Sequence, residues 1–259
     1  MKIILKLFPL LILVFLGGCF EIQEDIDVKS NGSGQMTVNM DMSQLLALMQ
    51  NYLGKEEMDK QMPQKSIDTT VFMKDLVDTA KSIPADKKAL LRNGKLHMVL
   101  NMTDKVFKTD LHFPFKNLTD LQKIYTSLND GSLNTTSLFK GLTGGHGDSA
   151  DNANNNATPD MSQFNSIYDF QSKDGLVSRK LNAERWKALQ DNPQFGQMKD
   201  VGSMGVEMPY TLTIKLPRPV KKVDNALAKL SDDKKTVTIK YNLTEVFQNP
   251  EKFEYTIAY

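Results

Sequence analysis

Apolar and polar residues alternate along most of this chain, and that pattern limits the folds it can adopt. The alternating segments are residues 20–28, 36–42, 96–102, 107–113, 167–171, 176–181, 208–216, 237–243 and 253–259. Such strands pack one face and leave the other in water, as in antiparallel sheets. Apolar residues at helical spacing predict helices over 43–53, 69–82 and 117–129, and a short helix capped by Asn182. We therefore expect an α+β fold, a large antiparallel sheet with helices packed on one face.

Turn residues between these segments set the predicted strand pairs. The turn over residues 31–34 predicts a hairpin that pairs Val28 with Met36. The turn at Asp104-Lys105 predicts a second hairpin, in which Leu96, Met98 and Met102 pair with Phe113, Leu111 and Phe107. In that register, His97 and His112 lie directly opposite each other on the polar face. A third hairpin joins residues 167–171 to 176–181.

The first 18 residues have the pattern of a secretory signal peptide. Lys2 and Lys6 are followed by an apolar run over residues 7–16, and two glycines then precede Cys19. The run is too short to span a bilayer, which takes about 20 apolar residues. A plain signal peptide with an incidental cysteine is the alternative interpretation.

The sequence Leu16-Gly17-Gly18-Cys19 resembles the lipobox of bacterial lipoproteins. In that family the chain is cut before the cysteine, whose sulfur and amino group are then acylated. The resemblance implies a lipidation site at Cys19, with palmitate as the expected acyl chain, and anchoring of the protein in a membrane. Phe20, in place of an aspartate after the cysteine, resembles the outer-membrane address of enterobacterial lipoproteins. We thus expect a signal peptide over 1–18, then one α+β domain over 19–259 in the bacterial cell envelope.

Composition limits the partners of the mature chain. The sequence has 32 basic and 31 acidic residues, and two of the lysines lie in the signal peptide, so the remainder is almost neutral. A nucleic-acid partner is not expected, because binding phosphates requires a basic surface. Cys19 is the only cysteine, which excludes disulfides and thiolate metal sites once it is lipidated. Residues 141–160 are mostly Gly, Asn, Asp, Ser and Ala, which predicts a flexible insertion within the domain.

Few side chains are candidates for a catalytic or metal site. The opposed His97 and His112 could hold one metal ion with Asp110 as a third ligand, but exposed histidines without metal are the preferred interpretation. Solvated surface positions are predicted for three acidic pairs: Glu24-Asp25, Glu56-Glu57 and Asp232-Asp233. Trp186 and the nearby Phe195 could line a ligand site, although core packing is the simpler interpretation. We expect no catalytic residue, no metal and no cofactor.

Methionines occupy several positions predicted to face inward. They are Met36, Met40, Met42, Met98 and Met102. Methionine adapts to irregular apolar shapes. These residues therefore fit either a cavity for a lipid tail between the sheet and the helices or an ordinary core.

Both ends of the mature chain are similar to the LppM-type family of bacterial envelope lipoproteins. The similar segments are residues 25–28, 31–34, 40–43, 208–217 and 230–239, together with the lipobox. The resemblance implies an α+β domain that interacts with envelope lipids and provides no catalytic residue. The predicted function is therefore that of a non-catalytic, lipid-anchored envelope lipoprotein that binds a lipid or other apolar ligand. A structural or partner-binding envelope component and a hydrolase with an unrecognised site are the alternatives.

Overall fold

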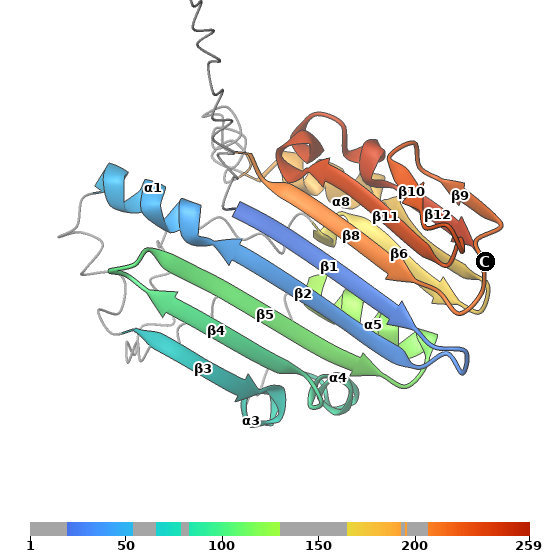
Figure 1. The fold of residues 1–259 in the computed structure, drawn as a ribbon, viewed down its shortest axis with the longest axis horizontal. Coiled ribbons are helices and arrows are strands. Elements are labelled where there is room, and N and C mark those ends of the chain that lie inside the picture. Colours follow the sequence, from blue (N-terminus) through green and yellow to red (C-terminus); the bar gives the residue numbers. More distant parts are fainter. Residues whose placement is uncertain (1–19, 54–65, 79–82, 130–164, 193–194, 196–206) are drawn as a thin grey trace, which may run out of the picture.

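Two β-sheets form the frame of the domain (Figure 1). The structure is a computed structural model that describes residues 20–53, 66–78, 83–129, 165–192, 195 and 207–259. The predicted signal peptide, Cys19 and the predicted insertion at 141–160 lie outside these residues. Among the described residues, none forms a helix long and apolar enough to cross a membrane.

The larger sheet has eight strands and, apart from one parallel pair, it is the large antiparallel sheet that the sequence predicts. In spatial order the strands are β10 (Ala228–Leu230), β11 (Thr236–Asn242), β8 (Pro209–Lys215), β1 (Phe20–Val28), β2 (Gly34–Met42), β5 (Val106–Phe115), β4 (Lys95–Asn101) and β3 (Ile67–Phe72). The neighbouring strands β8 and β1, third and fourth in this order, are parallel, which local alternation does not reveal. The N-terminal strand β1 therefore lies beside β8, a strand from the last quarter of the chain.

The inner face of this sheet is covered by a second sheet as well as by helices. The second sheet consists of β6 (Tyr168–Lys173), β7 (Leu176–Leu181), β12 (Tyr255–Ala258) and β9 (Lys222–Asp224). The predicted strands over 167–171, 176–181 and 253–259 thus belong to this second sheet and not to one large sheet, and β9 is a strand that the alternation did not predict. The helices are α1 (Ser43–Leu53), α3 (Met73–Val77), α4 (Ala85–Leu91), α5 (Leu118–Asn129), α8 (Ala183–Gln190), and the 3-10 helices η1 (Leu243–Phe247) and η2 (Pro250–Phe253).

Two groups of buried side chains hold these layers together. The larger core joins both sheets and includes α5, which contributes Leu121 and Ile124, each fully buried. In Figure 1, α5 lies behind β1 and β2, and β6 lies behind β8. A smaller cluster packs Leu46 of α1 against Met98, Leu100 and Phe107 of the β4–β5 hairpin. The predicted helices over 43–53 and 117–129 are thus confirmed, but α1 covers a different part of the sheet from α5.

Both predicted N-terminal hairpins form, but the residues that lie opposite each other differ from the predicted ones. In the first, Val28 lies opposite Gly34 and Ile26 opposite Met36. In the second, Leu100 lies opposite Phe107, and four residues, 102–105, form the turn. Each register is two residues away from the predicted one. An even shift keeps every side chain on its predicted face, so the apolar pattern alone does not distinguish the two registers.

The predicted helix over 69–82 is wrong over its first four residues. Residues 67–72 form strand β3, which pairs with β4 at the edge of the sheet, and α3 begins only at Met73. Residues 79–82 lie outside the described residues. The third predicted hairpin is confirmed as β6 and β7, and the Asn182 side chain caps α8 by accepting a hydrogen bond from the Arg185 amide at 3.1 Å.

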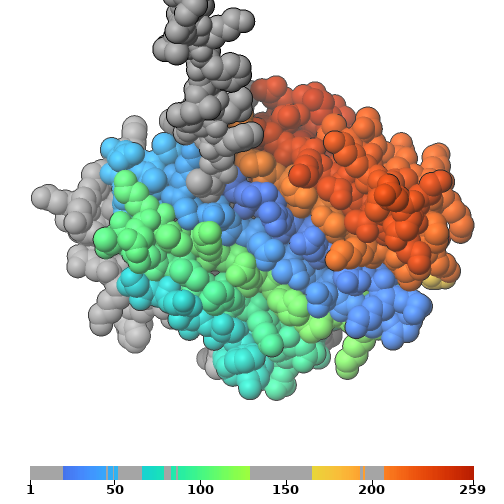
Figure 2. Space-filling model, in the orientation of Figure 1, coloured from blue at the N-terminus to red at the C-terminus, as the bar shows by residue number. Residues whose placement is uncertain are grey.

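The outer face of the larger sheet is open and polar. Strands β1, β2 and β5 form one continuous surface at the centre of Figure 2. The outward positions along β1 are Glu21, Gln23, Asp25 and Asp27, and their neighbours on β8 are threonines and a lysine.

Candidate functional site

A carboxylate lies on the apolar side of β1, where the alternation leads one to expect a hydrophobic residue. Glu24 shares the inward face with Phe20, Ile22, Ile26 and Val28, and only 2% of its surface is exposed. This corrects the prediction that Glu24 is solvated. The hydroxyl of Tyr210, on the neighbouring strand β8, donates a hydrogen bond to its Oε2. Burial raises the pKa of Glu24 to about 7, although the positive charge of Arg179 opposes the increase.

The compensating positive charge comes from the second sheet. Arg179 lies on β7, is only 4% exposed, and donates from Nη1 to the hydroxyl of Tyr241 at 3.4 Å. Its guanidinium carbon lies 4.1 Å from the centre of the Tyr168 ring. The rings of Tyr210 and Tyr241 stack at 4.8 Å, so the two tyrosines connect the glutamate of one sheet to the arginine of the other. We call Glu24, Arg179, Tyr168, Tyr210 and Tyr241 the buried polar cluster.

Several polar atoms in and beside the buried polar cluster make no hydrogen bond to the described protein atoms. They are Oε1 of Glu24, Nε and Nη2 of Arg179, and the hydroxyl of Tyr125. The Tyr125 ring stacks on Phe170 at 3.8 Å, and burial raises the pKa of the Tyr125 hydroxyl well above its usual range. Burial also raises the pKa of Tyr241 to about 12. The tyrosines are therefore neutral at physiological pH, and Glu24 is the group whose charge changes near neutrality.

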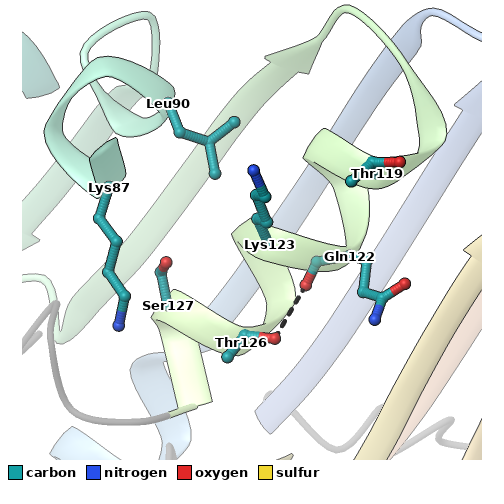
Figure 3. A pocket seen from close by; sticks show the side chains of 7 residues that line it. All are labelled: Lys87, Leu90, Thr119, Gln122, Lys123, Thr126 and Ser127. Carbon is teal, nitrogen blue, oxygen red and sulfur yellow. Dashed lines mark hydrogen bonds between the residues drawn. The ribbon is translucent and has the colours of Figure 1, made fainter.

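Two surface pockets among the described residues are not lined by any residue of the buried polar cluster. The larger, of about 220 Å³, lies between α4 and α5 at the surface. It is lined by Lys87, Leu90, Thr119, Gln122, Lys123, Thr126 and Ser127 (Figure 3). The smaller, of about 90 Å³, lies beside the β1–β2 turn and Tyr259. Small-molecule pockets usually hold about 300–1,000 Å³, and both of these are smaller.

Six of the seven residues that line the groove between α4 and α5 have polar side chains, and Leu90 is the exception. Lys123 projects into it from α5 and Lys87 borders it from α4 (Figure 3). The Thr126 hydroxyl donates to the Gln122 carbonyl at 3.1 Å, so that hydroxyl is already engaged within the helix. The Ser127 hydroxyl is buried and has no partner among the described atoms.

The two histidines singled out by the sequence are not opposite each other. The two-residue shift of the hairpin register places His97 opposite Asp110 and His112 opposite Lys95. His97 lies between two aspartates, with Nε2 3.0 Å from Asp68 and Nδ1 3.2 Å from Asp110. These hydrogen bonds raise the pKa of His97 above its usual value. His112 instead contacts Thr37, and in the described ranges no group of three His, Cys, Asp or Glu residues is arranged to hold a metal ion.

The remaining candidate residues occupy ordinary structural positions. Asp232 and Asp233 are exposed in the turn before β11, as predicted, whereas Glu56 and Glu57 lie outside the described residues. Trp186 packs edge-on against Phe195 at 5.5 Å, and Phe195 packs against Phe247 at 5.6 Å, so Trp186 belongs to an aromatic contact rather than to a pocket. Of the inward methionines, Met36 and Met98 are 3% and 1% exposed, and protein side chains surround them.

Comparisons with known proteins give one weak structural likeness. No known family of sequences matches the chain, and no curated protein is similar to it at a significant level. The folded domain of LppM from Mycobacterium tuberculosis, solved by NMR, is similar in structure with a TM-score of 0.33 and 8% sequence identity. The likeness covers 95% of this chain and 90% of that domain. At this TM-score it assigns no ligand, activity or location to the present chain.

Proposed function

We propose that this protein is a non-catalytic lipoprotein of the bacterial cell envelope, held at a membrane by acyl chains on Cys19. The observation that carries the proposal is the sequence Leu16-Gly17-Gly18-Cys19 after a short apolar run and two lysines. Acyl chains contribute about 0.8 kcal/mol for each buried methylene, so two or three chains suffice for a stable anchor. The outer membrane is the proposed destination, because Phe20 rather than an aspartate follows the cysteine.

A non-catalytic role is supported by the surroundings of the polar side chains. The group with the strongest pKa change near neutrality, Glu24, is enclosed between the two sheets and reaches neither pocket. The exposed His97 is already engaged on both ring nitrogens by aspartates. Neither group is placed to act on a substrate in the described part of the chain.

Within this proposal, a structural or partner-binding role is favoured over that of a lipid carrier. A carrier would need an apolar cavity between the sheet and the helices. Side chains of the second sheet and of α5 occupy that layer among the described elements, and Met36 packs in it. The outer face of the larger sheet, where β1 exposes polar side chains, is the surface that we propose for a protein partner.

The test is the fate of the Cys19→Ser variant in its own host. We expect it to remain as the uncut precursor or to appear in the soluble fraction, whereas the wild-type protein sediments with membranes. Gly18→Ala is the matched control, because it keeps a small residue before the cysteine and should be processed and anchored normally. A cut, membrane-bound Cys19→Ser product would overturn the proposal.

A further inference from the structure

The folded domain begins directly after the proposed anchor. Phe20 is the first residue of β1, is 1% exposed, and lies opposite Met42 of β2. One peptide unit, about 3.8 Å between α-carbons, separates it from Cys19. Given the lipidation of Cys19 proposed above, on which this inference rests, no spacer separates the sheet from the bilayer. The end of the sheet where β1 begins must therefore lie at the membrane surface.

Helix α1 lies at the same end of the sheet. Met42, the partner of Phe20, is followed directly by Ser43, the first residue of α1 (Figure 1). The helix is fixed there by Leu46, which packs on Phe107 at the start of β5. Gln50 also donates a hydrogen bond from its side chain to the Met102 carbonyl, at 3.1 Å, in the β4–β5 turn. These contacts fix α1 beside the anchor and prevent it from folding back over the rest of the domain.

The chemistry of α1 differs from that of the other described helices. Its sequence, SQLLALMQNYL, contains no charged residue, whereas α3, α4, α5, α8, η1 and η2 each contain at least one. Among the α1 side chains that the structure describes, the exposed ones are Gln44, Leu48 and Asn51, whose spacing i, i+4 and i+7 places them on one face. Leu48, at the centre of that face, is 42% exposed. A single exposed leucine is common on soluble proteins, but an uncharged face beside an acyl anchor is suited to the headgroup boundary of a bilayer.

We propose that α1 is a second membrane contact, with the face formed by Gln44, Leu48 and Asn51 resting in the headgroup region of the bilayer that holds Cys19. The affinity of this face need not be high, because the anchor already keeps it at the surface. The strands of the larger sheet then point away from the membrane. The β1–β2 turn at residues 29–33 lies at the far end of β1, roughly 26 Å from Phe20 at about 3.3 Å per residue.

Single-cysteine labelling tests this orientation on the full-length lipidated protein in vesicles. Cys19 is the only cysteine of the chain, so acylation leaves no competing thiol. A fluorophore sensitive to polarity is attached to Leu48→Cys, and the matched control is Ser30→Cys in the exposed β1–β2 turn. We expect lipids that carry a nitroxide headgroup to quench the label at 48 several-fold more than the label at 30, and iodide in the water to show the reverse order. Asn51→Cys repeats the measurement on the same face in case Leu48→Cys folds poorly.

The possible outcomes separate this proposal from the one it rests on. Equal quenching by iodide at positions 48 and 30, in protein whose mass shows acylated Cys19, overturns the orientation and leaves the anchor intact. A label at 48 that neither quencher reaches shows that protein covers α1, which also overturns the orientation. An unmodified Cys19 in the purified protein removes the anchor and, with it, the membrane contact of α1.

Discussion

Replacing Glu24 by glutamine should stabilise the protein at alkaline pH and remove part of its pH dependence. Burial raises the pKa of Glu24 from its ordinary value of 4.5 to about 7. At about 1.4 kcal/mol for each pKa unit, ionising Glu24 in the folded protein costs about 3 kcal/mol more than in the unfolded chain. The folded protein therefore retains a proton that the unfolded chain has released. The contribution of Glu24 to stability is complete below about pH 4.5 and is lost as the pH rises to about 7.

The assay is urea denaturation of the wild-type protein and Glu24→Gln, from about pH 5 to about pH 8. The glutamine keeps a carbonyl oxygen to accept from Tyr210 but cannot ionise, so the free energy of unfolding of Glu24→Gln should exceed that of the wild type by up to about 3 kcal/mol at the alkaline end. The difference should become small at the acidic end. Asp25→Asn, on the outward face of the same strand, is the control and should change little. A constant difference across this pH range, or a less stable Glu24→Gln at alkaline pH, would refute the reasoning.

Three further predictions concern residues around the cores and the outer face. Arg179→Met should raise the pKa of Glu24 further, because it removes the positive charge that favours the ionised carboxylate. In the same urea assay, the variant should therefore lose more stability at alkaline pH than at acidic pH, and an equal loss at both ends would contradict the electrostatic coupling. Gly94→Ala should lower the free energy of unfolding by about 1–3 kcal/mol, since a methyl group at Gly94 would lie 2.3 Å from the Phe113 ring; unchanged thermal unfolding would contradict it. Asp110→Asn should lower the pKa of His97 in an NMR titration, because Asp110 stabilises the protonated ring. The raised pKa of His97 stabilises the folded protein below the pKa that His97 has in the unfolded chain, and this stabilisation is lost as the pH rises through the folded pKa. The variant should therefore lose part of that stabilisation. An unchanged pKa in that variant would show that the contact with Asp110 is absent in solution.

The sequence predicts the faces of the strands well and their long-range partners poorly. Alternation assigns Met98 and Leu100 to the inner side correctly, because one buried face is a local property of a strand. It does not choose between registers two residues apart, which is why His97 was predicted opposite His112 rather than opposite Asp110. The formation of strand β3 also depends on a non-local contact, because residues 67–72 become a strand by pairing with β4, some 30 residues later in the chain.

The buried polar cluster had one visible signal in the sequence. Glu24 interrupts the apolar positions 20, 22, 26 and 28, and a charged residue at such a position predicts a buried partner or a special pKa. Its partner was not predictable, because Arg179 lies on another sheet and stands among residues typical of a surface strand. The polar environment of Glu24 depends on how the two sheets pack, and local patterns do not contain that information.

Intact mass spectrometry of the protein extracted from its own membrane tests the central claim most directly. We expect a mature chain that begins at Cys19 and is heavier than residues 19–259 by the mass of its acyl groups, with fragmentation placing that mass on the first residue. A mature chain that begins at another residue, or one whose Cys19 carries a free thiol, would contradict the claim that this protein is a lipid-anchored component of the envelope.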